Sequence, residues 1–184
     1  LFCLGSNNNP GIISTCSTFQ VDDINNPEIV LSFARKTGCT TAVIGPENPL
    51  SEGVADLLDK HGLNVIGPKK KLAQIETSKS FTRSLQKEYS IPGAPIYQAF
   101  DSMDGVNEFL NLLGEDFVVK YDGLAGGKGV KVSGEHLHSK EEALGHCQEL
   151  VNKGGRFVIE EKFIGEEFSL MSFCDGKGLK HMPA

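Results

Sequence analysis

A glycine-rich segment between two lysines is the part of this sequence best suited to binding phosphate. It runs Val118-Val-Lys-Tyr-Asp-Gly-Leu-Ala-Gly-Gly-Lys-Gly-Val130. Glycines let backbone N–H groups approach an anion closely, and Lys120 and Lys128 bring positive charge to the same place. It is not a Walker A loop, because Asp122 stands where the first glycine is needed and a strand, not a helix, follows. We expect a flexible flap over nucleotide phosphates, and the alternative is a glycine-rich hairpin with solvated lysines.

Carboxylates gather in a second segment, from Val158 to Phe168, which contains Glu160, Glu161, Glu166 and Glu167. A strand that leaves the core here would present backbone groups to the edge of a nucleobase. A carboxylate just beyond it would suit the hydroxyls of a ribose. Taken alone, the segment fits an acidic, solvated loop better.

Two further positions lie where ligands commonly bind. Lys79 follows Ser78 in the first turn of an expected helix, although most such lysines are simply exposed. Gly45, Pro46 and Glu47 lie at the carboxyl end of an expected parallel strand, where open α/β sheets bind ligands. Glu47 is a candidate substrate contact, or it favours the positive end of the next helix.

The elements that must position these residues change in kind along the chain. Residues 1–4 resemble the end of a strand, and residues 5–11 form a loop. Asn26-Pro27 opens a helix that Gly38 ends, and strands at 41–44 and 63–66 enclose a helix opened by Asn48-Pro49. Such a strand–helix–strand unit predicts an α/β fold with a parallel sheet.

The second half predicts an α+β arrangement with antiparallel strands. A helical region covers 69–88, and Ser139 with Glu142 forms a capping box at the start of another helix. Asp175-Gly176 predicts a hairpin turn. The expected strands are 96–100, 117–120, 130–132, 156–160 and 167–174, and the expected helices are 102–113 and 139–152.

Composition excludes several classes of protein. The chain has 184 residues, a net charge of −6 and 23% charged residues. It has no apolar run of the roughly 18 residues that span a bilayer, and its acidic balance argues against a general nucleic-acid binder. Its five cysteines are odd in number and widely spaced, which favours a reducing, cytoplasmic setting. The spacing of the histidines predicts no metal site.

Together these segments resemble the glycinamide ribonucleotide synthetase (phosphoribosylamine–glycine ligase) family of ATP-grasp enzymes. The string GPE-x-PL-x-x-GV-x-D and the loop K-x-DGLA-x-GKGV are far more specific together than either is alone. Lys162 stands where the family more often has an apolar residue. The stretches that carry the resemblance are Val43–Asp56, Ile66–Pro68, Ser78–Arg83, Val119–Val130 and Ile159–Glu167.

The resemblance implies a set of site residues. Two lysines contact the ATP phosphates, the glycine flap closes over them, the segment that begins at Glu160 reads adenine, and Glu167 holds the ribose. The residues implied for ATP are Lys79, Lys120, Gly123, Gly126, Gly127, Lys128, Gly129, Glu160, Glu161, Phe163 and Glu167. Those implied for the phosphoribosylamine pocket are Gly45, Pro46 and Glu47. No catalytic nucleophile is implied.

The resemblance also implies a reaction and a domain plan. ATP would activate glycine to glycyl phosphate, which 5-phosphoribosylamine attacks to give glycinamide ribonucleotide, ADP and phosphate in purine biosynthesis. Mg²⁺ or Mn²⁺ would be held by residues beyond Ala184, so this chain would be an incomplete part of the enzyme, inactive alone. We expect a partial Rossmann-like substrate-binding domain (1–68), then the start of an ATP-grasp core (69–115), its lid and hinge (116–174) and a truncated return to the core (175–184).

The partners that follow are small molecules, with no nucleic acid and no membrane, and fusion to other purine-pathway domains stays open. Two alternatives stand beside this interpretation. One is another ATP-grasp ligase of the purine pathway, such as a carboxylating synthase. The other is a non-catalytic nucleotide-binding module built on the same fold.

Overall fold

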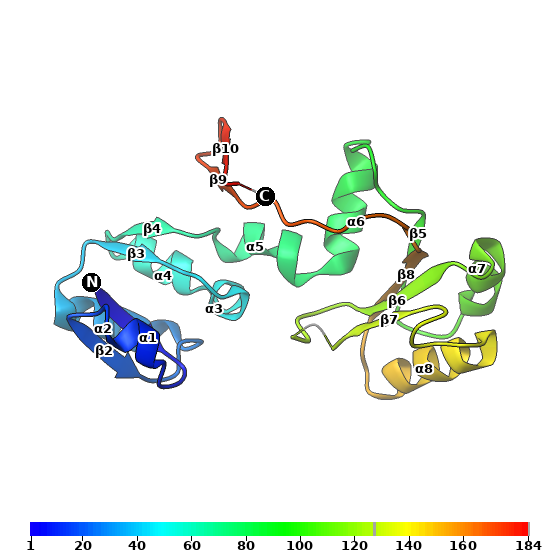
Figure 1. Ribbon diagram of the computed structural model, residues 1–184, viewed down its shortest axis with the longest axis horizontal. Helices are drawn as coiled ribbons and strands as arrows, with labels where there is room; N and C mark the ends of the chain where they lie inside the picture. The colour runs from blue at the N-terminus through cyan, green and yellow to red at the C-terminus, as the bar shows by residue number, and fades with distance from the viewer. Residues whose placement is uncertain (127, 184) are drawn as a thin grey trace.

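The computed structural model describes residues 1–126 and 128–183, which form two lobes joined by a pair of helices (Figure 1). The first lobe is α/β with parallel strand pairs, and the second is an antiparallel sheet with helices on one face. The predicted change of fold type along the chain is therefore confirmed. Within the described residues no helix is both long enough and apolar enough to span a membrane.

The first lobe contains two pairs of parallel strands. Its elements are β1 (Phe2–Gly5), α1 (Pro10–Ile13), β2 (Thr18–Val21), α2 (Pro27–Thr37), β3 (Thr41–Val43), α3 (Glu47–Glu52), α4 (Val54–Lys60) and β4 (Asn64–Ile66). β1 pairs with β2, and β3 pairs with β4 as the strand–helix–strand pattern predicted, whereas the pairing of β1 with β2 was not predicted. The single helix expected between β3 and β4 is two helices, because Gly53 adopts a left-handed φ of 88° and ends α3.

Local capping explains where α2 begins and ends. The Asn26 side chain accepts hydrogen bonds from the N–H groups of Glu28 (3.1 Å) and Ile29 (3.3 Å). Gly38, with φ 67°, closes the helix, as predicted. The expected loop at residues 5–11 is partly wrong, because Asn9 caps α1 by accepting from the N–H of Ile12 at 3.1 Å. The strand β2 was not predicted from the sequence.

Two helices, α5 (Lys70–Thr77) and α6 (Lys79–Glu88), connect the lobes. The sequence predicted one helical region here, but Ser78 is extended and interrupts it. The Ser78 hydroxyl accepts a hydrogen bond from the Phe81 N–H at 3.2 Å and so caps α6. The break fixes the direction of α6, which lies against β8 in the second lobe.

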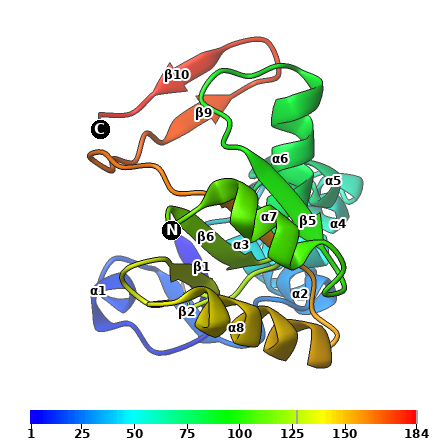
Figure 2. The ribbon, with the colours of Figure 1, turned by 90° about the vertical axis from the view of Figure 1, so that its right-hand side faces the viewer.

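The second lobe is a four-stranded antiparallel sheet in the order β5-β8-β6-β7. Its elements are β5 (Tyr97–Phe100), α7 (Val106–Leu113), β6 (Phe117–Tyr121), β7 (Val130–Val132), α8 (Lys140–Asn152) and β8 (Phe157–Glu161). The helices α7 and α8 cover one face, the face turned toward the viewer in Figure 2. Under them lies the core, in which Phe157 is fully buried and stacks on Phe100 with 5.5 Å between ring centroids.

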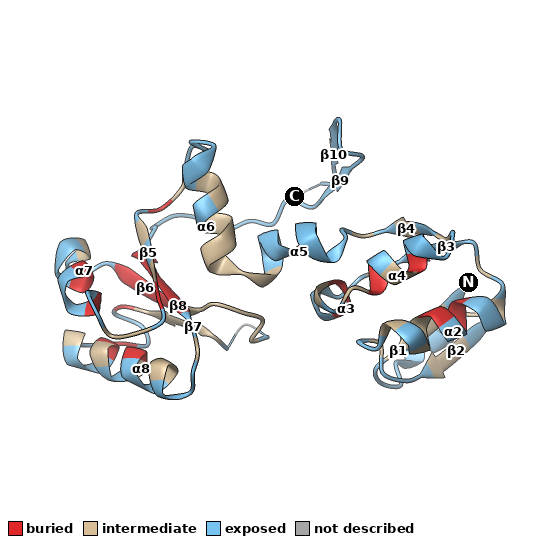
Figure 3. Cartoon of the chain, turned by 180° about the vertical axis from the view of Figure 1, so that it is seen from behind, coloured by how far each residue is buried: buried red, intermediate tan, exposed pale blue. Residues whose placement is uncertain are grey.

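Buried residues cluster on facing surfaces within each lobe (Figure 3). In the first lobe, Leu31 on α2 packs with Val54 and Leu58 on α4. In the second, α7 and α8 contribute Leu110 and Cys147 to the core against the sheet. Each lobe therefore has a hydrophobic core of its own.

The chain ends in a hairpin of β9 (Ser172–Cys174) and β10 (Leu179–His181). The predicted turn at Asp175 is present, because its carboxylate accepts from the N–H groups of Lys177 (2.9 Å) and Gly178 (2.8 Å). The strand expected at 167–174 is too long, since only its last three residues pair with β10. The subdivision at residues 68, 115 and 174 stays a prediction.

Candidate functional site

A buried ion pair lies on the face of the sheet opposite α7 and α8. Val118 pairs with Glu160 across β6 and β8, so Lys120 is the diagonal neighbour of Glu160 on the same face. The Lys120 ammonium forms an ion pair with the Glu160 carboxylate. Only 3% of Glu160 is exposed. The antiparallel register therefore brings together two residues that the sequence analysis assigned to different parts of a nucleotide site.

Arg83, on α6, supplies a second cation to the same carboxylate. Its Nε lies 2.6 Å from Glu160 Oε2 and its Nη2 lies 3.0 Å from Oε1. Burial by itself raises the pKa of Glu160, but hydrogen bonds from Arg83 and Lys120 outweigh it and hold the pKa below its usual value. Glu160 is therefore ionised at neutral pH and carries two cations.

Arg83 was not predicted as a site residue, although its spacing from Lys79 is a signal in the sequence. Arg83 lies four residues after Lys79, so both side chains lie on one face of α6. Lys79 at the first turn of α6 donates to the Gly123 carbonyl at 2.8 Å. Three basic side chains (Lys79, Arg83 and Lys120) thus lie between the start of α6 and the sheet.

The beginning of the glycine flap is tied to α6 by Asp122. Its carboxylate accepts from the Ser78 hydroxyl (3.1 Å), the Ser80 N–H (3.1 Å) and the Ser80 hydroxyl. Burial raises the pKa of Asp122, but the hydrogen bonds from Ser80 and Ser78 outweigh it, so the pKa lies below its usual value. Neither Asp122 nor Ser80 was expected from the sequence to hold the flap.

Glycine is required at particular points of the flap. A Cβ on Gly129 would lie 2.7 Å from the Cβ of Ala125, and Gly126 has a left-handed φ of 54°. A Cβ on Gly123 would lie 2.7 Å from a ring carbon of Tyr121. The Lys128 side chain is exposed. Gly127, also expected in the ATP site, lies outside the described residues.

The expected adenine-reading segment follows β8. The Glu161 carboxylate accepts from the N–H of Ile96 at 3.0 Å, so this side chain is already engaged at the edge of the sheet. Lys162 donates to the Ser133 carbonyl at 3.0 Å and lies 3.4 Å from the Glu135 carboxylate. Its side chain is therefore directed to the turn after β7.

Two of the expected ATP contacts lie beyond β8. Phe163 is 62% exposed, which leaves its ring accessible to a ligand. Glu167 lines a shallow depression of about 510 Å³ together with Glu166, Phe168 and Ser169. In the described part of the chain no hydrogen bond or ion pair joins Glu167 to the cations around Glu160. The structure therefore does not connect the expected ribose contact, Glu167, with the expected phosphate-binding residues around Glu160.

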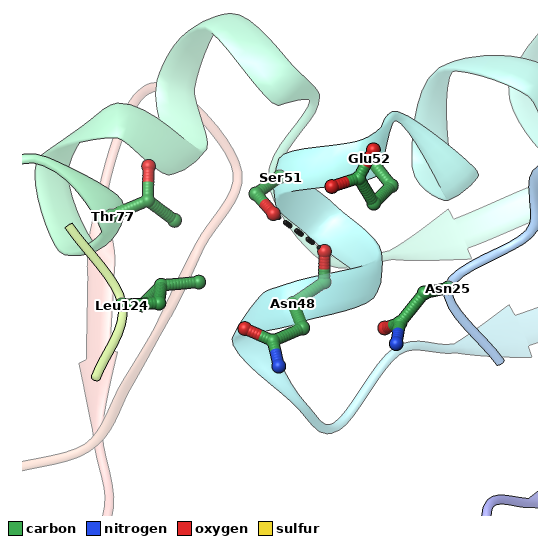
Figure 4. Close-up of a pocket in the computed structure, with 6 residues that line it drawn as sticks. All are labelled: Asn25, Asn48, Ser51, Glu52, Thr77 and Leu124. Atoms are coloured by element: carbon green, nitrogen blue, oxygen red, sulfur yellow. Dashed lines mark hydrogen bonds between the residues drawn. The ribbon is translucent and has the colours of Figure 1, made fainter. Parts of the chain in front are cut away.

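A polar pocket of about 480 Å³ lies where the first lobe meets the flap (Figure 4). Figure 4 shows Leu124 of the flap and Thr77 of α5 on one side of it. The residues that line it are Asn25, Asn48, Ser51, Glu52, Thr77 and Leu124. Glu47 and the preceding Gly45-Pro46 turn adjoin Asn48 in sequence and are exposed, but they do not line the pocket. Glu47 is the first residue of α3, where its charge favours the helix end.

Metal ligands are not evident in this site. Across residues 1–126 and 128–183 no three His, Cys, Asp or Glu side chains form a group that could hold an ion. Glu160, the most buried carboxylate of the site, is already paired with two cations. In the described residues Glu160 is therefore engaged by cations of the protein itself.

The two parts of the chain match two domains of one protein family. Residues 1–76 match the phosphoribosylglycinamide synthetase N domain, and residues 77–184 match the ATP-grasp (A) domain of the same family. The whole chain is 44% identical to a phosphoribosylamine–glycine ligase of Methanobrevibacter smithii and 38% identical to that of Thermococcus kodakarensis. It spans 43% and 42% of the lengths of these relatives.

Solved structures show the same architecture. A phosphoribosylamine–glycine ligase of Thermotoga maritima superposes with a TM-score of 0.74 at 26% identity, over 95% of this chain and 41% of that one. An N5-carboxyaminoimidazole synthetase of Staphylococcus aureus, solved with ADP, gives 0.72 at 14% identity, over 99% and 46%. The second likeness concerns the fold alone.

Proposed function

We propose a function from one premise: the chain belongs to the phosphoribosylglycinamide synthetase family and comprises an N domain and an ATP-grasp domain. The function is the ATP-dependent ligation of glycine to 5-phosphoribosylamine, with this chain as the part that holds ATP phosphates. The observation that carries the proposal is the set of three basic side chains at the beginning of the glycine flap. Arg83 and Lys120 share the ionised Glu160 carboxylate there, and Lys79 donates to the Gly123 carbonyl of the flap.

The chemistry requires charge neutralisation more than a protein nucleophile. Transfer of the γ-phosphoryl group to the glycine carboxylate brings two anions together, and fixed cations lower the cost of that approach. Lys79 is held by a backbone carbonyl that a phosphate oxygen can replace. Lys120 presents its ammonium on the face of the sheet opposite α7 and α8, with 23% of its side chain exposed. Both lysines can therefore exchange an internal partner for phosphate.

The flap supplies the second requirement, exclusion of water from an acyl phosphate. We propose that Gly123 to Gly129 closes over the β- and γ-phosphates and that Lys128 adds a contact. Leu124 belongs to the flap and lines the polar pocket, so closure of the flap would also affect that pocket. Because amide and hydroxyl groups line the pocket, it suits a hydroxylated substrate such as 5-phosphoribosylamine.

The adenine and ribose contacts remain proposals of the same kind. Phe163 and the backbone of Glu161 would read the base, and Glu167 would hold the ribose hydroxyls. Gly45, Pro46 and Glu47 would approach the phosphoribosylamine at the edge of the pocket. The metal ion that such a reaction uses, Mg²⁺ or Mn²⁺, is not assigned to any residue of this chain. We place the reaction in the cytoplasm, which suits five free cysteines.

The binding step can be tested on this chain. We expect titration with MgADP to show saturable binding, and Lys120→Met to weaken it by about tenfold or more, since a charged contact to phosphate is lost. Lys153→Met, which removes an exposed lysine at the end of α8, is the matched control and should leave the affinity unchanged. Equal affinities for the wild type and Lys120→Met would reject the assignment of Lys120.

The reaction itself is tested on the complete enzyme that contains this sequence. ADP release should depend on both glycine and 5-phosphoribosylamine. Release that requires bicarbonate instead would favour a carboxylating ligase and overturn the proposal. Nucleotide binding without any turnover would favour a binding module.

A further inference from the structure

We propose that Arg83 is a positioning residue of the nucleotide site, which keeps Lys120 available to phosphate by sharing the Glu160 carboxylate with it. The proposal rests on the proposed function, because it concerns the same phosphate site. Arg83 does not need to touch the nucleotide. It acts through Glu160, the residue that it shares with Lys120.

The contacts of Arg83 define its orientation completely. Nε and Nη2 each donate to one oxygen of Glu160, at 2.6 and 3.0 Å, and Nη1 donates to Gln86 Oε1 at 2.8 Å. All three guanidinium nitrogens are therefore engaged within the protein. A side chain fixed in this way is suited to orient an adjacent side chain and is poorly suited to bind a nucleotide directly and reversibly.

The balance of charge shows why a second cation matters. Glu160 is buried, and its lowered pKa means that it carries a full negative charge. With Lys120 alone this pair would be neutral, and the ammonium would be committed to its only strong partner. With Arg83 added, the group of three carries one net positive charge. That charge attracts phosphate on the face where Lys120 is partly exposed.

The geometry also explains the choice of arginine. The planar guanidinium spans both oxygens of Glu160 from α6, whereas the ammonium of Lys120 approaches from β6. Because Arg83 lies one helical turn after Lys79, the same contact fixes the rotation of α6 about its axis. Arg83 thereby sets the positions of both phosphate-binding lysines relative to the sheet.

The experiment compares nucleotide binding by the 184-residue chain and its variants in isothermal titration. We expect Arg83→Met to weaken MgADP binding by about tenfold, the worth of one charge-assisted interaction. Arg83→Lys should recover part of the loss, because it restores charge but not the two-point contact. Adenosine, which has no phosphate, should bind equally to the wild type and both variants. Lys87→Met, on the exposed end of α6, is the matched charge control.

A double-mutant cycle tests whether Arg83 acts through Glu160. In the background of Glu160→Gln, the further change Arg83→Met should cost much less ADP affinity than it does in the wild type. Equal costs in the two backgrounds would overturn the proposal, as would an equal loss of adenosine and ADP binding, which indicates general damage to the fold. If the wild type binds ADP and Arg83→Met binds it as tightly, Arg83 loses its role and the proposed function stands. If the wild type itself binds no ADP, the assignment of the phosphate site to this chain is refuted together with the role of Arg83, and the reaction is still decided by the assay of the complete enzyme.

Discussion

Asp122 connects the beginning of the glycine flap to the first turn of α6, and its removal is expected to free the flap. The Asp122 carboxylate accepts hydrogen bonds from Ser78 and from the hydroxyl and N–H of Ser80, while its own N–H donates to the Arg156 carbonyl at 2.9 Å. Asp122→Ala deletes the side-chain contacts and leaves the backbone bond. The sheet should therefore persist while the attachment between the flap and α6 is lost.

The magnitude follows from the number and kind of these bonds. A hydrogen bond to a charged group is worth roughly 1.5–3 kcal/mol net. The two serine hydroxyls are only half-buried and can turn to water, so we count about one such bond, or about 2 kcal/mol, as lost. Opening of the flap should then become roughly 30-fold more frequent. Asp122→Asn keeps an acceptor oxygen and should lose about half as much free energy.

Hydrogen exchange of individual amides measures this opening. The amide of Ser80 donates to the Asp122 side chain, and that of Tyr121 donates to the Gly129 carbonyl at 2.7 Å. Both should exchange roughly 30-fold faster in Asp122→Ala. Asp116→Ala is the matched control, because Asp116 is exposed just before β6 and bonds Lys162 through its backbone carbonyl. Unchanged exchange at Ser80 and Tyr121 would refute the argument.

The stabilisation of the flap by Asp122 should depend on pH in a defined direction. The folded pKa of Asp122 is lowered from its usual 3.8, so its contribution is fully present above that value. The contribution is lost as the pH falls through the lower, folded pKa. The difference in exchange between the wild type and Asp122→Ala should therefore be constant near neutral pH and shrink only in strong acid. A difference that vanished already near pH 6 would point to another group.

Three further changes test the core, the flap and the cysteines. Phe157→Ala should lower the free energy of unfolding by about 3–5 kcal/mol in urea titrations, because Phe157 is fully buried; a loss below about 1 kcal/mol would contradict its place in the core. Gly129→Ala should weaken MgADP binding, since its Cβ would lie 2.7 Å from that of Ala125, and unchanged affinity would show that the flap adapts without cost. Burial raises the pKa of Cys147 to about 12, so at pH 8 iodoacetamide should label the exposed Cys174 far sooner, and equal labelling rates would show that Cys147 is accessible.

Short-range signals in the sequence were sufficient for many elements. Asn26 and Gly38 define both ends of α2, and Ser139 caps α8 by accepting from the Glu142 N–H at 3.2 Å. These contacts lie within a few residues of each other, so sequence spacing contains them. The predicted capping box differs in one contact. The Glu142 carboxylate accepts from the N–H of His138 at 2.7 Å and not from that of the N-cap residue Ser139.

Errors arose where a partner from elsewhere in the chain was needed. β2 was missed because Thr18–Val21 is a strand only through its pairing with β1. The strand expected at 167–174 was too long, because only the residues opposite β10 are paired. The hydrophobic pattern indicates which residues favour an extended backbone, but a strand also requires a partner strand that pairs with it in the correct register.

In the candidate site, too, some features could be predicted from local sequence and others depend on contacts between distant residues. The glycine flap, Lys79, Lys120 and the acidic segment after Val158 could be identified from residue type, because backbone freedom and charge are properties of single residues. Only the tertiary structure placed Arg83 and Lys120 on one buried carboxylate and tied Asp122 to the start of α6. The residues in these contacts lie at least 40 positions apart along the chain, and Arg83 and Glu160 are separated by 77. The sheet register and the rotation of α6 bring them together, and neither can be obtained from local spacing.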